Sequence, residues 1–255
     1  MDKRRIAQGF SRARSTYERA ARVQQEVAQE MLCLLHVYGD TRRGITDEVL
    51  EVGCGTGLYS RLLLRDFHPG TLYLNDLCTD MQENLGDLLA LPGVYFLPGD
   101  AEALPLPPGV SLITSCSTLQ WFADPARFFR RCSRALMPGG LLCLSTFGPD
   151  NLREIRAVAG GGLDYLTQEE LVGLLPSGLH PLHVSQRIAT LAFPTPEDVL
   201  RHLRQTGVTG TEKRVWTRGH LQAFTDEYVR LFSRPDGQVT LTYHPMFLVA
   251  ERIAP

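Results

Sequence analysis

Three glycines at alternate positions after a short apolar stretch constrain the fold of this chain more than any other feature. Gly53, Gly55 and Gly57 follow the apolar residues 49–52, and a helix-like stretch, residues 58–67, comes directly after them. Glycine permits backbone angles that a side chain forbids, and it lets a ligand approach the main chain closely. A strand, a glycine turn and a helix in this order are typical of an α/β protein that holds a nucleotide-like ligand. The plain alternative is a tight turn without a ligand.

The spacing of the glycines narrows the choice of ligand. A dinucleotide-binding turn has the pattern G-x-G-x-x-G, which would require a glycine at position 58. This chain has Leu58 there and a glycine at position 57 instead. The turn is therefore not the dinucleotide fingerprint.

Apolar segments alternate with helix-like segments from residue 48 onward, which predicts a parallel, doubly wound α/β sheet. We predict strands at residues 49–52, 71–75, 94–97, 111–116 and 141–147, and helices at 58–67, 79–90 and 125–136. In the second half, helices are predicted at 151–158, 167–175, 196–205 and 220–232, and strands at 181–193 and 238–252. The last two strands have no clear crossover between them, so we expect them to pair antiparallel.

The chain is expected to form a single domain, because no independent linker, repeat or low-complexity tract interrupts it. Apolar residues recur at steps of three or four between residues 6 and 34, which predicts one long amphipathic helix or two shorter ones. We expect a helical lid at 1–38, a core at 48–193, a helical cap inserted at 194–236 and the last strand at 237–255.

Charge and cysteine content exclude several classes of protein. The 255 residues carry a formal net charge of -2, whereas a general nucleic-acid binder would have a basic excess. The six cysteines form no C-x-x-C pair, so we expect no metal site and a reducing, cytoplasmic compartment. No apolar run is long enough to cross a bilayer, and the basic start lacks the apolar segment of a secretory signal.

Acidic and small polar residues follow the predicted strands, where ligands bind in doubly wound sheets. Asp76 ends the second strand, and a carboxylate there can accept hydrogen bonds from both hydroxyls of a ribose. The alternative for Asp76 is a helix N-cap. Asp100 follows the third strand, and the fourth runs into Ser115 and a small polar segment that ends in Trp121. We expect these residues to line one crevice.

Four motifs together resemble class I S-adenosylmethionine-dependent methyltransferases over roughly residues 48 to 147. They are Glu51-Val-Gly-Cys-Gly-Thr-Gly57, Asp76-Leu-Cys-Thr-Asp-Met81, Gly99-Asp-Ala-Glu-Ala-Leu-Pro105 and Arg134-Ala-Leu-Met-Pro-Gly-Gly140. The resemblance implies a Rossmann-like, mostly parallel seven-stranded sheet with an antiparallel last strand, and S-adenosylmethionine as cofactor. It implies these cofactor-binding residues: Glu51, Gly53, Cys54, Gly55, Gly57, Asp76, Leu77, Met81, Asp100, Ala101, Glu102, Ser115 and Gln120.

A narrower resemblance covers most of the chain. The N-terminal Lys3-Arg-Arg-Ile-Ala7, the segments 119–122 and 145–154, and Leu241-Thr-Tyr-His-Pro245 look like the BioC family. Its members are malonyl-acyl-carrier-protein O-methyltransferases of biotin synthesis. The resemblance implies that the acceptor is the free carboxyl of a malonyl thioester, on acyl carrier protein or coenzyme A. An ionised carboxylate needs no general base.

The acceptor and its carrier are both acidic, so we expect local positive charge. Arg153, Arg201 and Arg204 are candidates for holding the malonyl carboxylate, because an arginine fork fixes a carboxylate well. The other charges of the predicted cap are expected to steer the carrier protein: His202, Lys213, Arg214 and Arg218. Tyr17, with Gln24, is expected to turn from the lid toward the methionine end of the cofactor or the acceptor.

Two other functions remain open from the sequence. One is a methyltransferase that acts on a quinone precursor or another small metabolite, which should need a base if the acceptor is a phenol. The other is a regulatory protein that binds the cofactor without turnover.

Overall fold

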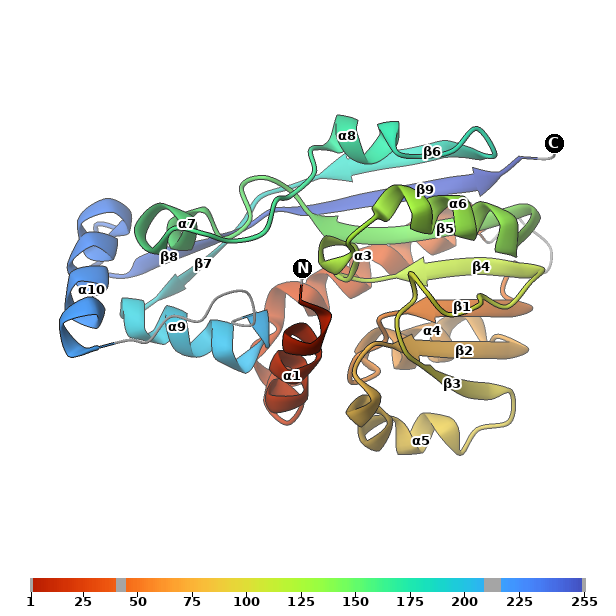
Figure 1. Cartoon of the computed structure of the whole chain (residues 1–255), viewed down its shortest axis with the longest axis horizontal. Coiled ribbons are helices and arrows are strands. Elements are labelled where there is room, and N and C mark those ends of the chain that lie inside the picture. Colours follow the sequence, from red (N-terminus) through yellow and green to blue (C-terminus); the bar gives the residue numbers. More distant parts are fainter. Residues whose placement is uncertain (1, 40–44, 209–216, 254–255) are drawn as a thin grey trace.

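A seven-stranded sheet organises the structure, a computed structural model that describes residues 2–39, 45–208 and 217–253 (Figure 1). Its strand order is β3-β2-β1-β4-β5-β9-β6. The strands are β1 (Glu48–Val52), β2 (Thr71–Asp76), β3 (Val94–Pro98), β4 (Val110–Ser115), β5 (Leu136–Phe147), β6 (Leu179–Gln186) and β9 (Pro245–Arg252). β1 to β5 pair parallel, and β9 runs antiparallel to both β5 and β6. The predicted fold class is confirmed.

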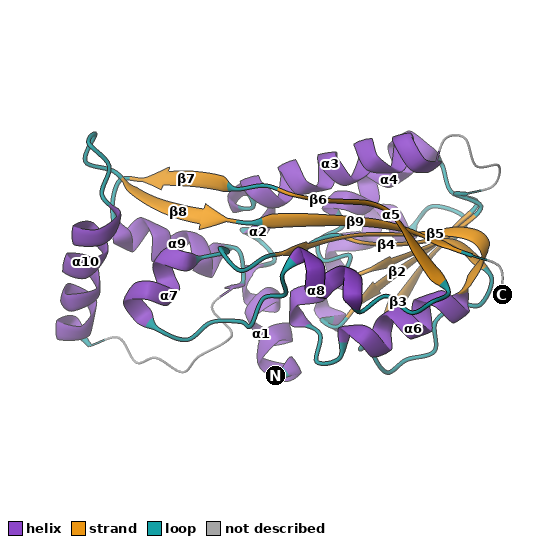
Figure 2. Cartoon of the chain, turned by 90° about the horizontal axis from the view of Figure 1, so that it is seen from above, coloured by secondary structure: helices purple, strands orange, loops and turns teal. Residues whose placement is uncertain are grey.

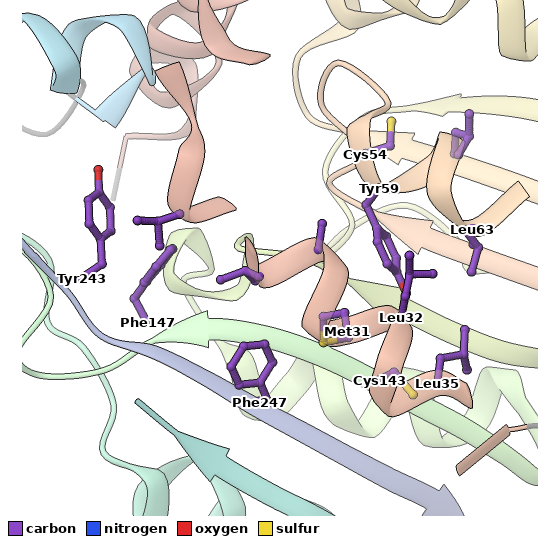
Figure 3. Packing of buried hydrophobic residues seen from close by; sticks show 14 of the residues in the cluster. Met31, Leu32, Leu35, Cys54, Tyr59, Leu63, Cys143, Phe147, Tyr243 and Phe247 are labelled. Carbon is purple, nitrogen blue, oxygen red and sulfur yellow. The ribbon is translucent and has the colours of Figure 1, made fainter. Parts of the chain in front are cut away.

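Helices cover both faces of this sheet (Figure 2). One face carries α3 (Arg22–Gly39), α4 (Leu58–Phe67), η1 (Thr79–Leu85) and α5 (Gly86–Leu89), and the other carries α6 (Pro125–Ala135) and α8 (Gln168–Gly173). Met31 and Leu63 pack with the first core, which Figure 3 shows. Phe128 and Phe129 fill the second core. The central strands β1, β4 and β9 and the second half of β5 are mostly buried because helices cover both of their faces.

The helix starts follow from local sequence. Asp124 caps α6 by accepting a hydrogen bond from the Arg127 backbone N–H, and Pro125 occupies the first turn, where its missing N–H does no harm. The Thr167 side chain and Glu170 form a capping box on α8. These signals place both helices close to their predicted ranges.

A smaller part of the molecule extends beyond the sheet (Figure 1). It contains α7 (Arg153–Ala159), α9 (Pro196–Gln205), α10 (Arg218–Phe232) and a separate two-stranded antiparallel sheet of β7 (Ala189–Phe193) and β8 (Val239–Tyr243). Two further helices, α1 (Lys3–Ala13) and α2 (Tyr17–Ala20), contact α9 and lie between this part and the main sheet. In the described parts of the chain, no helix is both long and apolar enough to cross a membrane.

The structure differs from the predicted elements at three places. The predicted strand 181–193 is two strands, β6 and β7, and the predicted strand 238–252 is β8 and β9. The second break falls at His244, just before Pro245, which lacks an N–H and begins a strand more readily than it continues one. The predicted helix 79–90 is mostly the 3₁₀ helix η1, followed at Gly86 by the short α5; glycine in a helix interior is unfavourable.

Candidate active site

A cavity of about 800 Å³ of empty space lies at the carboxyl ends of β1, β2 and β4. The helix α1 covers it with Lys3, Ile6, Ala7 and Phe10. Seven of the predicted cofactor residues line it: Gly53, Gly55, Asp76, Leu77, Met81, Asp100 and Ala101. Tyr17, the predicted lid tyrosine, lines it as well. Its position at the carboxyl edge of the sheet matches the place where doubly wound folds bind ligands.

The three glycines of the turn have different tasks. All three have positive φ angles, +73° at Gly53, +54° at Gly55 and +85° at Gly57. A Cβ at Gly53 would overlap the Thr118 side chain, and one at Gly57 would lie 2.7 Å from Leu85. A Cβ at Gly55 would meet nothing within 4 Å, so the main chain is open there. Gly55 thus leaves the backbone accessible to a ligand, whereas the other two glycines allow close packing.

Asp76 connects the glycine turn to the end of β2. Its Oδ2 accepts a hydrogen bond of 2.8 Å from the Gly55 N–H, and its Oδ1 accepts one of 2.7 Å from the Cys78 N–H. Burial raises the pKa of Asp76 to about 6, against the lowering effect of these two N–H donors. The carboxylate is held in a fixed orientation at the cavity wall, as ribose recognition requires.

Asp100 meets a residue that sequence reasoning did not assign to the site. The Lys3 ammonium donates to Asp100 Oδ2 at 2.6 Å and also contacts the Glu102 carboxylate. Glu102 further accepts hydrogen bonds from the Ala123 and Asp124 N–H groups, at 2.9 and 2.6 Å. Glu102 therefore secures the loop around Asp100 and does not line the cavity. The charge of Lys3 alone gave no signal that its partners lie 97 and 99 residues away.

The other predicted cofactor residues stand behind the cavity wall. Glu51 is almost fully buried, its Oε2 has no hydrogen-bond partner, and burial raises its pKa to about 7. Cys54 is also buried, and burial raises its pKa. Ser115 donates from its hydroxyl to the Val52 carbonyl at 2.8 Å. These residues shape the turn and are not among those that line the cavity.

A second cavity, of about 380 Å³, adjoins the first. The two share Phe10, Tyr17, Ser117 and Trp121. The remaining lining residues come from distant parts of the chain: Gln24, Gln120, Phe147, Asn151, Leu152, Tyr165, Thr206, Val208 and Tyr243. Gln120, predicted to bind the cofactor, and Gln24, predicted to face the methionine end or the acceptor, both lie in this second cavity.

The structure does not bring the predicted arginines to either cavity. Among the described residues that line them, the only basic side chain is Lys3. Arg153 lies 3.9 Å from Glu154 with half of its side chain exposed, Arg201 pairs with Asp198, and Arg204 is exposed. The distance in space between these arginines and the strand ends could not be judged from sequence. Helix periodicity shows which residues share a face, but not what that face packs against.

The other charges of the predicted cap have different fates. His202 is buried, its Nε2 shares a hydrogen bond of 2.7 Å with the Tyr243 hydroxyl, and burial lowers its pKa. It is therefore neutral at pH 7, and the expectation that it steers the carrier is wrong. Arg218 begins α10, and Lys213 and Arg214 lie outside the described residues. In the described ranges, no cluster of three His, Cys, Asp or Glu side chains could hold a metal.

Sequence reasoning also missed Asn75 in the first cavity, whereas Thr118 belongs to the segment that was expected there. The Asn75 amide donates to the carbonyls of Leu97 and Gly99, at 2.7 and 3.0 Å, and so joins the ends of β2 and β3. A polar side chain just before Asp76 in an apolar strand was the available signal.

Comparisons with known proteins agree with this geometry. A family model described as a methyltransferase domain matches residues 50–144. Among solved structures, a candidate methyltransferase from Bacillus halodurans superposes with a TM-score of 0.66 at 18% identity, over 89% of this chain and 100% of that one. A geranyl diphosphate methyltransferase in complex with S-adenosylmethionine superposes with a TM-score of 0.54 at 17% identity, over 89% and 85%. Fold and site define a class I S-adenosylmethionine-dependent methyltransferase.

Sequence relatives identify the family. A malonyl-[acyl-carrier protein] O-methyltransferase from Bacteroides helcogenes is 50% identical over 98% of this chain and 99% of the relative. One from Haemophilus influenzae is 39% identical over 98% and 95%. A Bacteroides fragilis relative is 49% identical over 97% of this chain, which spans 50% of that longer protein. The chain belongs to the malonyl-[acyl-carrier protein] O-methyltransferase family.

Proposed function

We propose that this protein transfers a methyl group from S-adenosylmethionine to the free carboxylate of a malonyl group, carried as a thioester on acyl carrier protein. The observation that carries the proposal is the second cavity, which adjoins the first and shares four of its wall residues. A donor in one cavity and an acceptor in the other would meet at this shared wall. Family membership supports the choice of acceptor.

The residues of the first cavity fit the cofactor. Asp76 would accept hydrogen bonds from the two ribose hydroxyls and Asp100 one from the adenine amino group, and the open backbone at Gly55 would let the methionine part approach closely. When bound, S-adenosylmethionine supplies a methyl group on a positively charged sulfonium. The lid residues of α1 close the cavity from above and exclude water, which strengthens electrostatic interactions inside it.

The lining of the second cavity fits a carboxylate acceptor better than a phenol. A phenol has a pKa near 10 and must lose its proton to react, whereas a carboxylate is already ionised at pH 7. Among the described residues that line this cavity there is no Asp, Glu or His that could act as a base. The walls therefore have to align the acceptor and do not have to deprotonate it.

The carrier protein and the pathway complete the proposal. Arg201, Arg204 and Arg218 are exposed on the outer helices, where they are suited to attract an acidic carrier protein to the acceptor side. Methylation would hide the charge of the malonyl group, so that fatty acid synthesis could extend it toward biotin. We place this reaction in the cytoplasm, where the carrier protein and its elongating enzymes work.

The test is transfer of a labelled methyl group to defined acceptors. We expect label on malonyl-acyl carrier protein, released by mild base as an ester, and little on a phenolic quinone precursor. Malonyl-coenzyme A tests whether the carrier protein is needed. Methylation of the phenol alone would overturn the proposal, as would failure to complement a biotin-requiring strain that lacks its own methyltransferase.

A further inference from the structure

We propose that the second cavity holds the acceptor carboxylate with two neutral hydrogen-bond donors, Ser117 and Trp121, and that the positive charge that the carboxylate faces belongs to the cofactor. This inference rests on the proposed function and deepens it, because it names the residues that select an anionic acceptor.

Two donors in this cavity lack partners. Ser117 Oγ and Trp121 Nε1 are each buried without a hydrogen bond within the protein, and Trp121 is only 8% exposed. Gln24 Oε1 has no partner either, but an amide oxygen accepts and cannot hold a carboxylate. Buried donors without a partner are rare and costly, so two of them on one wall indicate a missing hydrogen-bond acceptor.

Other polar groups that line the same cavity already have hydrogen-bond partners. They form its walls and are not free to bind an acceptor. The Asn151 amide donates to the Tyr165 hydroxyl at 2.8 Å, and the Gln120 amide donates to the Ser117 carbonyl at 2.6 Å. The Tyr243 hydroxyl is paired with His202. Ser117 and Trp121 therefore stand beside a framework that is already bonded.

The backbone at Ser117 carries a second sign of function. Ser117 has a φ angle of +57°, in the left-handed region that non-glycine residues rarely occupy. Its N–H donates to the Ser145 carbonyl and hydroxyl, both at 3.1 Å. Backbone strain that surrounding bonds maintain is concentrated at ligand sites. Ser117 lies on the wall that the two cavities share, where the reacting atoms must meet.

The absence of a cation from the described lining of the second cavity suits this reaction. A carboxylate oxygen forms a bond to the methyl carbon, while the carbon–sulfur bond breaks and its electron pair stays on sulfur. A negative carboxylate and a positive sulfonium become a neutral ester and a neutral thioether, with no proton transferred. An arginine would stabilise the carboxylate before reaction and lose that interaction as its charge disappears, so it would raise the barrier. Neutral donors orient the carboxylate with a smaller loss.

The experiment measures acceptor binding apart from turnover. Calorimetry follows malonyl-acyl carrier protein binding to the enzyme saturated with S-adenosylhomocysteine, which is neutral at sulfur, or with a cofactor analogue that has a protonated amine in place of the sulfonium. Variants are Trp121→Phe and Ser117→Ala, with Gln222→Leu as a control on the exposed face of α10. Trp121→Phe keeps an aromatic ring against Phe10, whose ring centroid lies 5.6 Å away.

We expect the amine analogue to tighten acceptor binding roughly tenfold or more over S-adenosylhomocysteine. Each of the two variants should weaken acceptor binding by about tenfold to a hundredfold and leave S-adenosylhomocysteine affinity within about threefold. The Gln222→Leu control should match the wild type.

Three results would overturn the inference. Unchanged acceptor affinity in both variants would show that these donors do not hold the carboxylate, while wild-type turnover would still support the proposed function. A parallel loss of S-adenosylhomocysteine affinity would assign the donors to the cofactor. A wild-type enzyme that neither binds nor methylates malonyl-acyl carrier protein would end both proposals.

Discussion

The two adjoining cavities are built in different ways. The first takes most of its wall from the ends of consecutive strands, so its residues stand in short motifs, such as the glycine turn and Asp76. The second collects residues from α3, the loops around 117–121 and 148–165, the end of α9 and β8, which lie far apart in the chain. The first carries acidic groups, and the described lining of the second is neutral. Recognition of a shared cofactor is thus local, and recognition of an acceptor depends on the assembled fold.

The largest effect should come from substitutions in the first cavity that remove contacts with the cofactor. Asp76→Ala removes an ionised acceptor for two hydroxyls, at roughly 1.5–3 kcal/mol per bond, so S-adenosylmethionine affinity should fall by a hundredfold or more. Gly55→Val should have a similar effect, because its side chain would enter open space in front of the backbone and its φ angle is +54°. Calorimetry on the folded variants is the measurement, with Asp226→Ala on the exposed face of α10 as control. Unchanged affinity in both would contradict the cofactor assignment.

Deletion of the lid tests whether the two cavities depend on α1 and α2 while the core folds without them. α1 and α2 can be deleted up to residue 20, but α3 cannot, because Val27, Met31 and Leu35 are fully buried. We expect the shortened protein to keep a cooperative thermal transition and to lose nearly all turnover, since Phe10 and Tyr17 belong to both cavities. The milder Tyr17→Phe variant asks whether the hydroxyl is needed. Full activity there would leave the lid its covering role and exclude the hydroxyl from the reaction.

Low pH should weaken cofactor binding in the first cavity and leave acceptor binding in the neutral second cavity unchanged. Burial raises the pKa of Asp76 to about 6, and only its ionised form accepts from both ribose hydroxyls. S-adenosylmethionine affinity should therefore fall as pH drops through 6, by about tenfold per pH unit below it. Titration calorimetry from pH 5 to 8 gives the profile. Asp76→Asn should remove this dependence, whereas Glu51→Gln should retain it; an unchanged profile in Asp76→Asn would rule out Asp76 as its origin.

The smallest effect should come from loosening one anchor of the lid. Lys3→Met removes the ion pairs with Asp100 and Glu102 while keeping an apolar stem over the cavity. Partly exposed ion pairs contribute about 1 kcal/mol or less, so cofactor affinity should change by no more than about fivefold. Stopped-flow fluorescence should show faster cofactor release in the variant. Release at the wild-type rate would mean that Lys3 does not hold the lid closed.

The same contrast explains how far the sequence could lead. The parallel strands, the glycine turn, Asp76 and Asp100 were predictable, because periodicity and residue order indicate parallel strands and the loops at their ends. The second cavity was not predictable, because no local sequence pattern links Gln24 to Tyr165 or Thr206. The arginines that were predicted to hold the carboxylate do not line the cavities, for a related reason. A charge on a helix face indicates that the side chain meets solvent or a partner, but the sequence does not show which of the two. His202 shows the same limit, since only packing against Tyr243 reveals it as buried and neutral.

The lid helix has a consequence for the timing of the reaction cycle. Besides Lys3, α1 and the residue after it are attached by Ser11 to Asp80 and by Arg14 to Glu83, each at 2.6 Å. The attachments hold the start of α1 to Asp100 and its end to η1, so detachment of either end would widen the way into the cavity. Because the attachments are ionic or charge-assisted and partly exposed, their opening rate should rise with ionic strength. The rate of cofactor exchange should therefore increase with salt concentration, independently of how well the acceptor fits.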